Sequence, residues 1–278
     1  MSNQTHNFMQ YRIHRILLVC SSYDGYTLEE DGRIDSQIIK EYGELNMSNP
    51  PSLTRVGSTK EARSLLEEGA QFDFIITKYN VGQPDVFDFS AIVKEKYPDL
   101  PVVLLTSYSR ELHRRIQDHN CDAIDNIFCW HGNADLIMAI IKMMEDRLNA
   151  ESDIVDGGVQ AILLAEVSFR FYSTYLPELY RILLEQNREF IKDAYNEQQL
   201  VSRKRARPKI LLATSYSEAV ELYRKYRNNL LGVITDLGMV INKGDRAETE
   251  KADAGAEICR MVKSETPWMP VIMQSSQD

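Results

Sequence analysis

Continuous apolar runs alternate with amphipathic stretches along the chain. The run at 13–20 (IHRILLVC) predicts a buried strand, and a pattern of helices and strands follows as far as a closing helix at 133–149. Apolar runs of this length, separated by helical periods, are typical of a parallel sheet covered by helices on both faces. Between these two elements, strands are predicted at 52–58, 72–77, 100–106 and 123–130, and helices at 34–44, 59–69, 89–97 and 109–119.

The same order of apolar runs then occurs a second time. The pairs are ILLVCSS (16–22) with ILLAEVS (162–168), FDFIITKYN (72–80) with LLGVITDLG (230–238), and LPVVLLTSY (100–108) with MPVIMQSSQ (269–277). A recurring series indicates two copies of one α/β unit. The second copy is predicted to contain strands at 159–166, 207–215, 230–236 and 269–276, and helices at 168–200, 216–226 and 256–265.

The polar, glycine-terminated stretch at 150–158 predicts a linker between a domain at 1–149 and a domain at 159–278. The second copy stops after its fourth strand, whereas the first continues with a helix, a strand and a helix. An uncovered strand would leave apolar surface bare. We therefore expect either that the chain is a fragment of a longer protein or that a partner completes the second sheet.

Composition narrows the class of protein. The chain has 278 residues, a net charge of −9, and four cysteines without a CxxC pair. The charge argues against general binding to nucleic acid or to an anionic membrane surface. The free thiols, the absence of a membrane-length apolar run and the polar N-terminus predict a cytoplasmic protein.

Three stretches depart from a simple repeat. The aromatic helix at 168–200 is long enough to serve both the core and an interface with a partner or a second copy. The charged insertion at 241–255 follows a strand end and could gate access to it. The basic run at 202–209 (SRKRARPK) could bind nucleic acid, phosphate or an acidic partner, but its simpler interpretation is a solvated lead into a strand.

The positions at the strand ends carry a family resemblance. The repeat resembles the receiver domain of response regulators, which implies a flavodoxin-like, doubly wound parallel sheet of order 2-1-3-4-5. In that family an acidic pair follows the first strand, a phospho-accepting Asp the third, a Ser or Thr the fourth and a Lys the fifth. The carboxylates hold Mg²⁺, which neutralises charge during phosphoryl transfer.

In the second copy, the resemblance implies that Asp236 is the phospho-acceptor and Ser275 the switch hydroxyl. Glu166, Asp236 and the backbone carbonyl of Gly238 would hold Mg²⁺. Val167 departs from the pattern, because the family has a metal-binding acid there. Alternatively, both residues have only structural roles: Asp236 caps a turn, and Glu166 is a solvated acid at a strand end.

In the first copy, Thr106 keeps the switch hydroxyl, but Lys78 replaces the acceptor. Cys20 and Ser21 replace the acidic pair, and Cys129 replaces the family's Lys. The first copy is therefore interpreted as a pseudo-receiver without a metal. Lys78 could mimic a neutralised pocket, for example by pairing with Asp24, or it could simply face solvent.

The leading hypothesis is a bacterial two-component signalling module rather than an enzyme, with a histidine kinase or phosphotransfer protein as its partner. Its output would be a change in homodimerisation or in a downstream domain. The tandem also resembles the N-terminal region of bacterial proteins that carry a phosphoenolpyruvate synthase-like domain. The alternative is a phosphorylation-independent dimerisation or scaffold module. No motif of a nucleotide-dependent or hydrolytic enzyme is present.

Overall fold

The computed structural model describes residues 8–21, 34–44, 49–107, 121–130, 135–192, 206–245 and 249–275. The predicted helix at 109–119, the proposed partner Asp24 and the end of the predicted helix at 168–200 lie outside these residues. The chain divides into two compact units, Ile13–Met138 and Met1–Arg12 with Ala139–Asp278.

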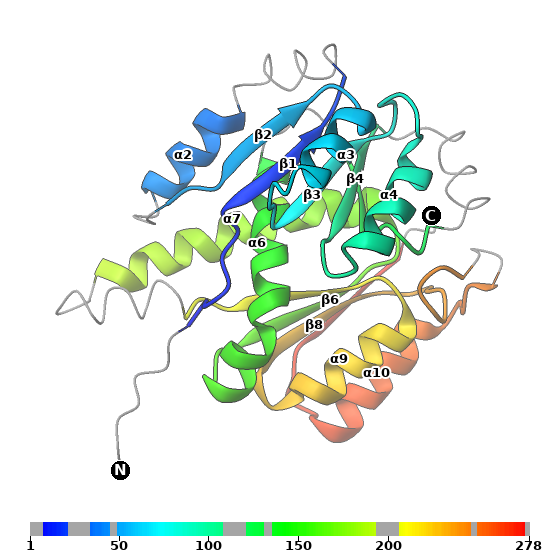
Figure 1. Ribbon diagram of the computed structural model, residues 1–278. Coiled ribbons are helices and arrows are strands. Elements are labelled where there is room, and N and C mark those ends of the chain that lie inside the picture. Colours follow the sequence, from blue (N-terminus) through cyan, green and yellow to red (C-terminus); the bar gives the residue numbers. More distant parts are fainter. Residues whose placement is uncertain are drawn as a thin grey trace. The chain divides into compact units, whose positions relative to one another are not determined.

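The first unit contains a five-stranded parallel sheet (Figure 1). Its order is β2-β1-β3-β4-β5, as expected for a doubly wound fold. The apolar sequences of β1, β3 and β4 are buried, as predicted for interior parallel strands. The strands are β1 (Arg15–Val19), β2 (Ser52–Val56), β3 (Phe74–Lys78), β4 (Val102–Thr106) and β5 (Asn126–Cys129), and the helices are α2 (Ile34–Glu44), α3 (Thr59–Glu67) and α4 (Val86–Lys96).

Helix α3 begins where the sequence predicts. The Ser58 hydroxyl accepts a hydrogen bond from the backbone N–H of Glu61 at 3.2 Å. The Glu61 carboxylate in turn accepts one from the Gly57 N–H at 2.8 Å. Gly69 follows the helix with a φ of +88°, a left-handed conformation that favours glycine. These short-range signals fix both ends of the helix.

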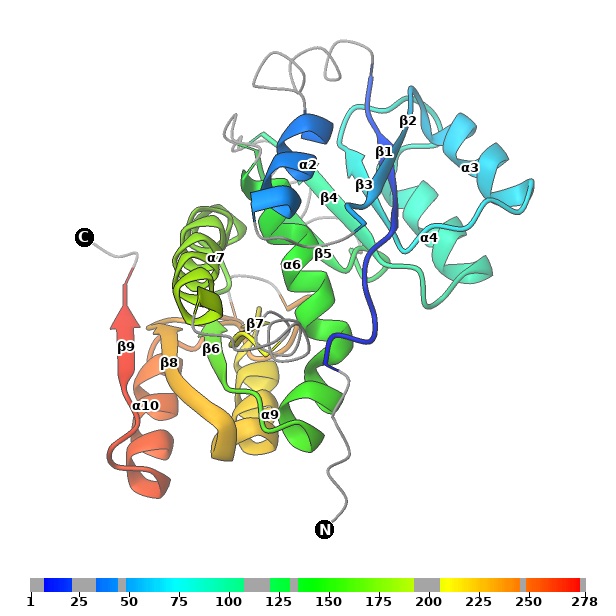
Figure 2. The same ribbon diagram turned by 90° about the vertical axis from the view of Figure 1, so that its left-hand side faces the viewer.

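The second unit repeats the arrangement with four parallel strands in the order β7-β6-β8-β9. Helices α9 and α10 lie on one face of this sheet and α7 on the other (Figure 2). The flavodoxin-like fold class is confirmed in both units. The strands are β6 (Ala161–Ala165), β7 (Lys209–Ala213), β8 (Leu230–Asp236) and β9 (Val271–Gln274), and the helices are α7 (Phe169–Lys192), α9 (Tyr216–Tyr226) and α10 (Ala254–Glu265).

No strand of the described residues pairs with the outer edge of β9. Ile272 and Met273 are 61% and 49% exposed, whereas Val103 and Leu104 at the equivalent positions of β4 are fully buried beside β5. Helix α7 has an aromatic inner side, and its Tyr172 and Tyr180 are buried. Within the part of the chain described, no helix is long and apolar enough to cross a membrane.

The stretch around the predicted linker is helical. Helix α6 (Asp135–Ala150) continues directly into a π-helical turn at Glu151–Asp156, where a polar linker was expected. The division between the units falls inside α6, near Ala139. The reason is a network of buried charges, which joins the end of α6 to the start of β7.

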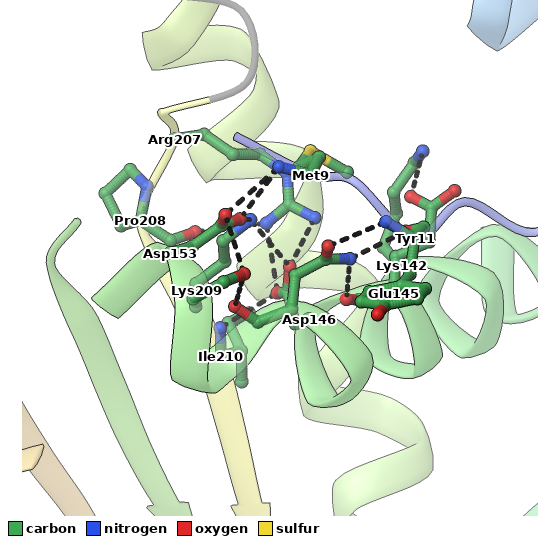
Figure 3. Close-up of polar contacts among 12 residues, drawn as sticks. Met9, Tyr11, Lys142, Glu145, Asp146, Asp153, Arg207, Pro208, Lys209 and Ile210 are labelled. Carbon is green, nitrogen blue, oxygen red and sulfur yellow. Dashed lines mark hydrogen bonds and ion pairs between the residues drawn. The ribbon is translucent and has the colours of Figure 1, made fainter. Parts of the chain in front are cut away.

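Asp146 of α6 is the centre of this network (Figure 3). Its carboxylate accepts hydrogen bonds from both terminal nitrogens of Arg207, at 2.7 and 3.0 Å. It also accepts hydrogen bonds from the Tyr180 hydroxyl at 2.9 Å and the Ile210 N–H at 3.0 Å. Asp146 is fully buried. These four hydrogen bonds, two of them from a cation, offset the cost of burying the negative charge of Asp146. They also attach α6 to the second unit.

The network continues to the N-terminal segment. Asp153 pairs with Lys209 Nζ at 2.7 Å and accepts hydrogen bonds from the Met9 N–H at 3.1 and 3.2 Å. Asn149 exchanges hydrogen bonds with the backbone of Tyr11, at 2.9 and 2.6 Å. Residues on both sides of the first unit in the sequence therefore belong to the second unit.

The network also corrects the interpretation of the basic run at 202–209. Arg207 and Lys209 were expected to be solvated, but both are buried and paired with Asp146 and Asp153. Residues 202–205 lie outside the described residues.

Candidate functional site

The pairing registers of the two sheets show which residues of the two repeats are equivalent. Val19 pairs with Thr77 in the first unit and Ala165 with Thr235 in the second, so Lys78 and Asp236 occupy equivalent strand ends. Lys78 pairs with Leu105, and Asp236 pairs with Gln274. The next residues along the chain, Thr106 and Ser275, therefore occupy equivalent positions.

In the second unit, two predicted residues meet at the carboxyl edge of the sheet. Glu166 follows β6 and Asp236 ends the neighbouring β8, and their carboxyl groups lie close enough to shift each other's pKa. Glu166 is 1% exposed and accepts hydrogen bonds from the Ser168 N–H at 2.9 Å and Gln274 Nε2 at 2.8 Å. Asp236 is 8% exposed and accepts one from the Leu237 N–H at 2.7 Å. The interpretation of Glu166 as a solvated acid is therefore wrong.

The carboxyl pair has unusual proton affinity. Burial, together with like-charge repulsion from the neighbouring Asp236, raises the pKa of Glu166 to about 7. Burial also raises the pKa of Asp236, and the charge of Glu250 adds to this effect.

The structure adds two residues that the sequence did not single out. Gln274 of β9 reaches Glu166, and Glu250 from the predicted insertion lies over Gly238. Gln274 could have been found from register, because it stands beside Asp236 in the neighbouring strand. Ser275, the predicted switch residue, is exposed directly after β9.

Val167 explains why only two acids converge here. Its side chain is partly buried and packs against the apolar core of the second unit. In the part of the chain that the structure describes, no group of three Asp, Glu, His or Cys side chains is arranged to hold a metal ion. The carboxyl groups of Glu166 and Asp236 are oxygen ligands of the kind that Mg²⁺ prefers, and the carbonyl of Gly238 as a third ligand stays a prediction of the family resemblance.

Two glycines allow other parts of the chain to approach the backbone near Asp236 closely. A Cβ at Gly238 would lie 1.9 Å from a carboxylate oxygen of Glu250. A Cβ at Gly255 would lie 2.1 Å from the backbone oxygen of Asp236, and the Gly255 N–H donates to Leu237 O at 2.9 Å. The start of α10 is therefore held directly against the end of β8.

Replacing Gly255 by Ala is expected to destabilise the second unit by about 1–3 kcal/mol, because the methyl group meets rigid backbone. Gly43→Ala in α2 is the matched control, because an added Cβ there has no neighbour within 4 Å. That change should stabilise its helix by roughly 0.5–1 kcal/mol. Urea unfolding of both variants checks the pair, and equal effects would contradict the close approach at Asp236.

The equivalent site in the first unit has different chemistry. Lys78 is 7% exposed, and its Nζ lies 5.4 Å from the centroid of the Trp130 ring, within range of a cation–π interaction. Thr106, Cys20 and Cys129 are also buried. The interpretation of Lys78 as a solvent-facing residue is therefore wrong. The strand end is built around a buried lysine.

Known structures resemble parts of the chain. The response regulator TrrA of Thermotoga maritima, in complex with Mg²⁺-BeF, is 19% identical, with 48% of this chain and 99% of that chain covered and a TM-score of 0.36. The phosphorylated cyanobacterial phytochrome response regulator RcpA is 19% identical, with 49% and 93% covered and a TM-score of 0.36. A response regulator receiver domain protein of Clostridium thermocellum is 17% identical, with 50% and 98% covered and a TM-score of 0.35.

No protein family and no curated protein matches the sequence. The similarity to these response regulators therefore concerns the fold alone. The sheet orders of the two units establish the flavodoxin-like class directly.

Proposed function

We propose that the protein is a regulatory, receiver-like module of the two-component type, and that Asp236 accepts a phosphoryl group. The observation that carries the proposal is the buried pair of Glu166 and Asp236 at the carboxyl ends of adjacent parallel strands. Ligands of open α/β sheets bind at this edge. The partner would be a histidine kinase or a phosphotransfer protein.

In the proposed reaction, a carboxylate oxygen of Asp236 attacks the phosphorus of the donor. The bond from phosphorus to the donor breaks, and the donor group leaves with the electron pair. Bound Mg²⁺ would neutralise charge on the transferring group. Glu166 must give up its proton to serve as an oxygen ligand, and Ser275 would donate a hydrogen bond to a phosphoryl oxygen.

The first unit would take no part in this chemistry. Lys78 occupies the position of the acceptor, and a protonated amine has no lone pair with which to attack phosphorus. The buried contact of Lys78 with Trp130 supports a fixed, pseudo-receiver state without a metal. A downstream phosphoenolpyruvate synthase-like domain remains a prediction of the family resemblance alone.

Intact mass after incubation with acetyl phosphate and Mg²⁺ tests the proposal. Wild type is expected to gain one phosphoryl group, and Asp236→Asn none. Asp245→Asn, at an exposed aspartate of the same unit, should behave as wild type. Absence of the adduct from folded wild type, or its persistence in Asp236→Asn, would refute phosphorylation at this site.

A phosphorylation-independent scaffold is the second candidate function. The apolar packing of Val167 and the exposed edge of β9 favour it. In this case, folded protein would form no adduct, and light scattering would give the mass of a dimer with or without acetyl phosphate.

A further inference from the structure

Strand β9 lies at the edge of the second sheet and lacks the features that usually protect an edge (Figure 2). The stretch 268–277 (WMPVIMQSSQ) contains no charged residue, and Ile272 and Met273 are exposed. Natural edge strands commonly carry charge, which prevents pairing with another chain. At other edges of the two sheets, β2 carries the exposed Arg55, and β7 is almost wholly buried. The edge of β9 is therefore suited to pairing with a further strand.

Hydrogen bonds to β8 show which backbone groups of β9 point outward. The Val233 N–H donates to Pro270 O at 3.0 Å, and the Leu237 N–H donates to Gln274 O at 2.9 Å. Backbone groups alternate in direction along a strand, so Ile272 also faces β8 with its N–H and C=O. The N–H and C=O groups of Val271 and Met273 then face the outer edge, where no strand of the described residues pairs with them.

The amino end of this edge is closed by contacts within the chain. The Met269 N–H donates to Thr266 O at 3.0 Å, and Met269 O accepts a hydrogen bond from Lys263 Nζ at 2.6 Å. Pairing along β9 can therefore begin only after Met269. Within the strand, the outward backbone groups are those of Val271 and Met273, and they are placed symmetrically about Ile272.

We propose that two copies of the chain pair through the outer edges of their β9 strands, antiparallel about a two-fold axis at Ile272. Val271 of one copy and Met273 of the other exchange two backbone hydrogen bonds, and the reverse pair exchanges two more. The two Ile272 residues face each other between these pairs, with their Cα atoms about 4.5 Å apart. The second sheets of the two copies thereby become one continuous sheet.

A second copy fits this edge because the edge is self-complementary. A two-fold contact brings the same surface of both copies together. The chain has a net charge of −9, but two uncharged strands meet without like charges opposite each other. Val271 packs against the core beneath α9 and α10, so Ile272 points to the opposite face, where it is 61% exposed. Pairing would cover each Ile272 side chain with its copy.

This inference deepens the scaffold function, because it names the surface and the register at which two copies pair. It does not depend on phosphorylation of Asp236. A short strand contact is typical of a transient dimer. Dimerisation should therefore depend on protein concentration.

Sedimentation equilibrium of the full chain over a series of concentrations tests the pairing. The mass of wild type is expected to rise toward that of a dimer. Ile272→Lys should weaken dimerisation by more than about tenfold, because two ammonium groups would lie opposite each other at the axis. Ile182→Lys is the matched control, because Ile182 is an exposed isoleucine on α7 of the same unit, and this variant should dimerise as wild type does.

Disulfide formation tests the register. Ile272→Cys, oxidised with copper phenanthroline, is expected to give a covalent dimer, because Cα atoms about 4.5 Å apart lie within the span of a disulfide. Ile182→Cys and wild type, which has four cysteines of its own, give the background. Both should yield far less covalent dimer than Ile272→Cys.

The outcomes separate this inference from the functions proposed above. Wild type that stays monomeric at every concentration would overturn the inference, and a phosphoryl adduct on that monomer would leave the acceptor role of Asp236 intact. A wild-type dimer that Ile272→Lys does not weaken, or Ile272→Cys that yields no covalent dimer above background, also overturns it. In these two cases the scaffold function stands and another surface forms the dimer.

Discussion

Asp146→Asn is expected to lower the free energy of unfolding of the second unit by about 3–5 kcal/mol. The carboxylate of Asp146 faces both terminal nitrogens of Arg207 and lies 3.8 Å from Lys209 Nζ, with all three side chains buried. Removing its charge leaves the guanidinium of Arg207 buried without its counterion. A buried charge that has lost its partner costs far more than a pair contributes.

Hydrogen exchange of β6–β9 peptides, measured by mass spectrometry over a series of urea concentrations, gives the free energy for this unit separately. Glu178→Gln is the matched control. Glu178 pairs with Arg181 at 2.7 Å, but both side chains are more than half exposed, and its loss should cause no resolvable change. A similarly small effect of Asp146→Asn would mean that Arg207 reaches water in solution.

Glu166→Gln is expected to remove a pH dependence of stability. The pKa of Glu166 is about 7 in the folded protein, above its ordinary value of 4.5, so the folded state binds more protons than the unfolded state between these values. Wild-type stability should therefore fall as pH rises from about 4.5 to 7 and stay lowered above 7. Glutamine is uncharged throughout and keeps the size of the protonated acid.

The difference in unfolding free energy between Glu166→Gln and wild type should grow by about 2 kcal/mol in favour of the variant between pH 5.5 and pH 8.5. Urea titrations in buffer containing a chelator measure this difference without metal. The exposed variant Glu178→Gln should differ from wild type by the same amount at both pH values. A constant difference for Glu166→Gln would show that Glu166 is already ionised at the lower pH.

The elements were predictable where their causes are local. Continuous apolar runs marked the buried strands, and the helix predicted at 59–69 corresponds to α3, which begins at Thr59 and is followed by Gly69. The equivalence of Lys78 and Asp236 also followed from sequence, because both end the third strand of a repeat.

Features that depend on distant partners were not predictable. Arg207 and Lys209 read as solvated because their counterions, Asp146 and Asp153, lie more than 50 residues earlier in the chain. Lys78 is buried against Trp130, which follows a different strand. Burial of a charge is decided by what packs around it, and that information is not local.

The division of the chain has a consequence for the order in which the protein is made. Met9 is synthesised before the first unit, but its hydrogen-bond partner Asp153 is 144 residues further on. All five strands of the first sheet are synthesised before α6, whereas the sheet of the second unit must wait for β9. Closure of such long-range contacts is slow compared with local folding. The segment that contains Met9 is therefore expected to reach its native contacts only after the first unit has been synthesised.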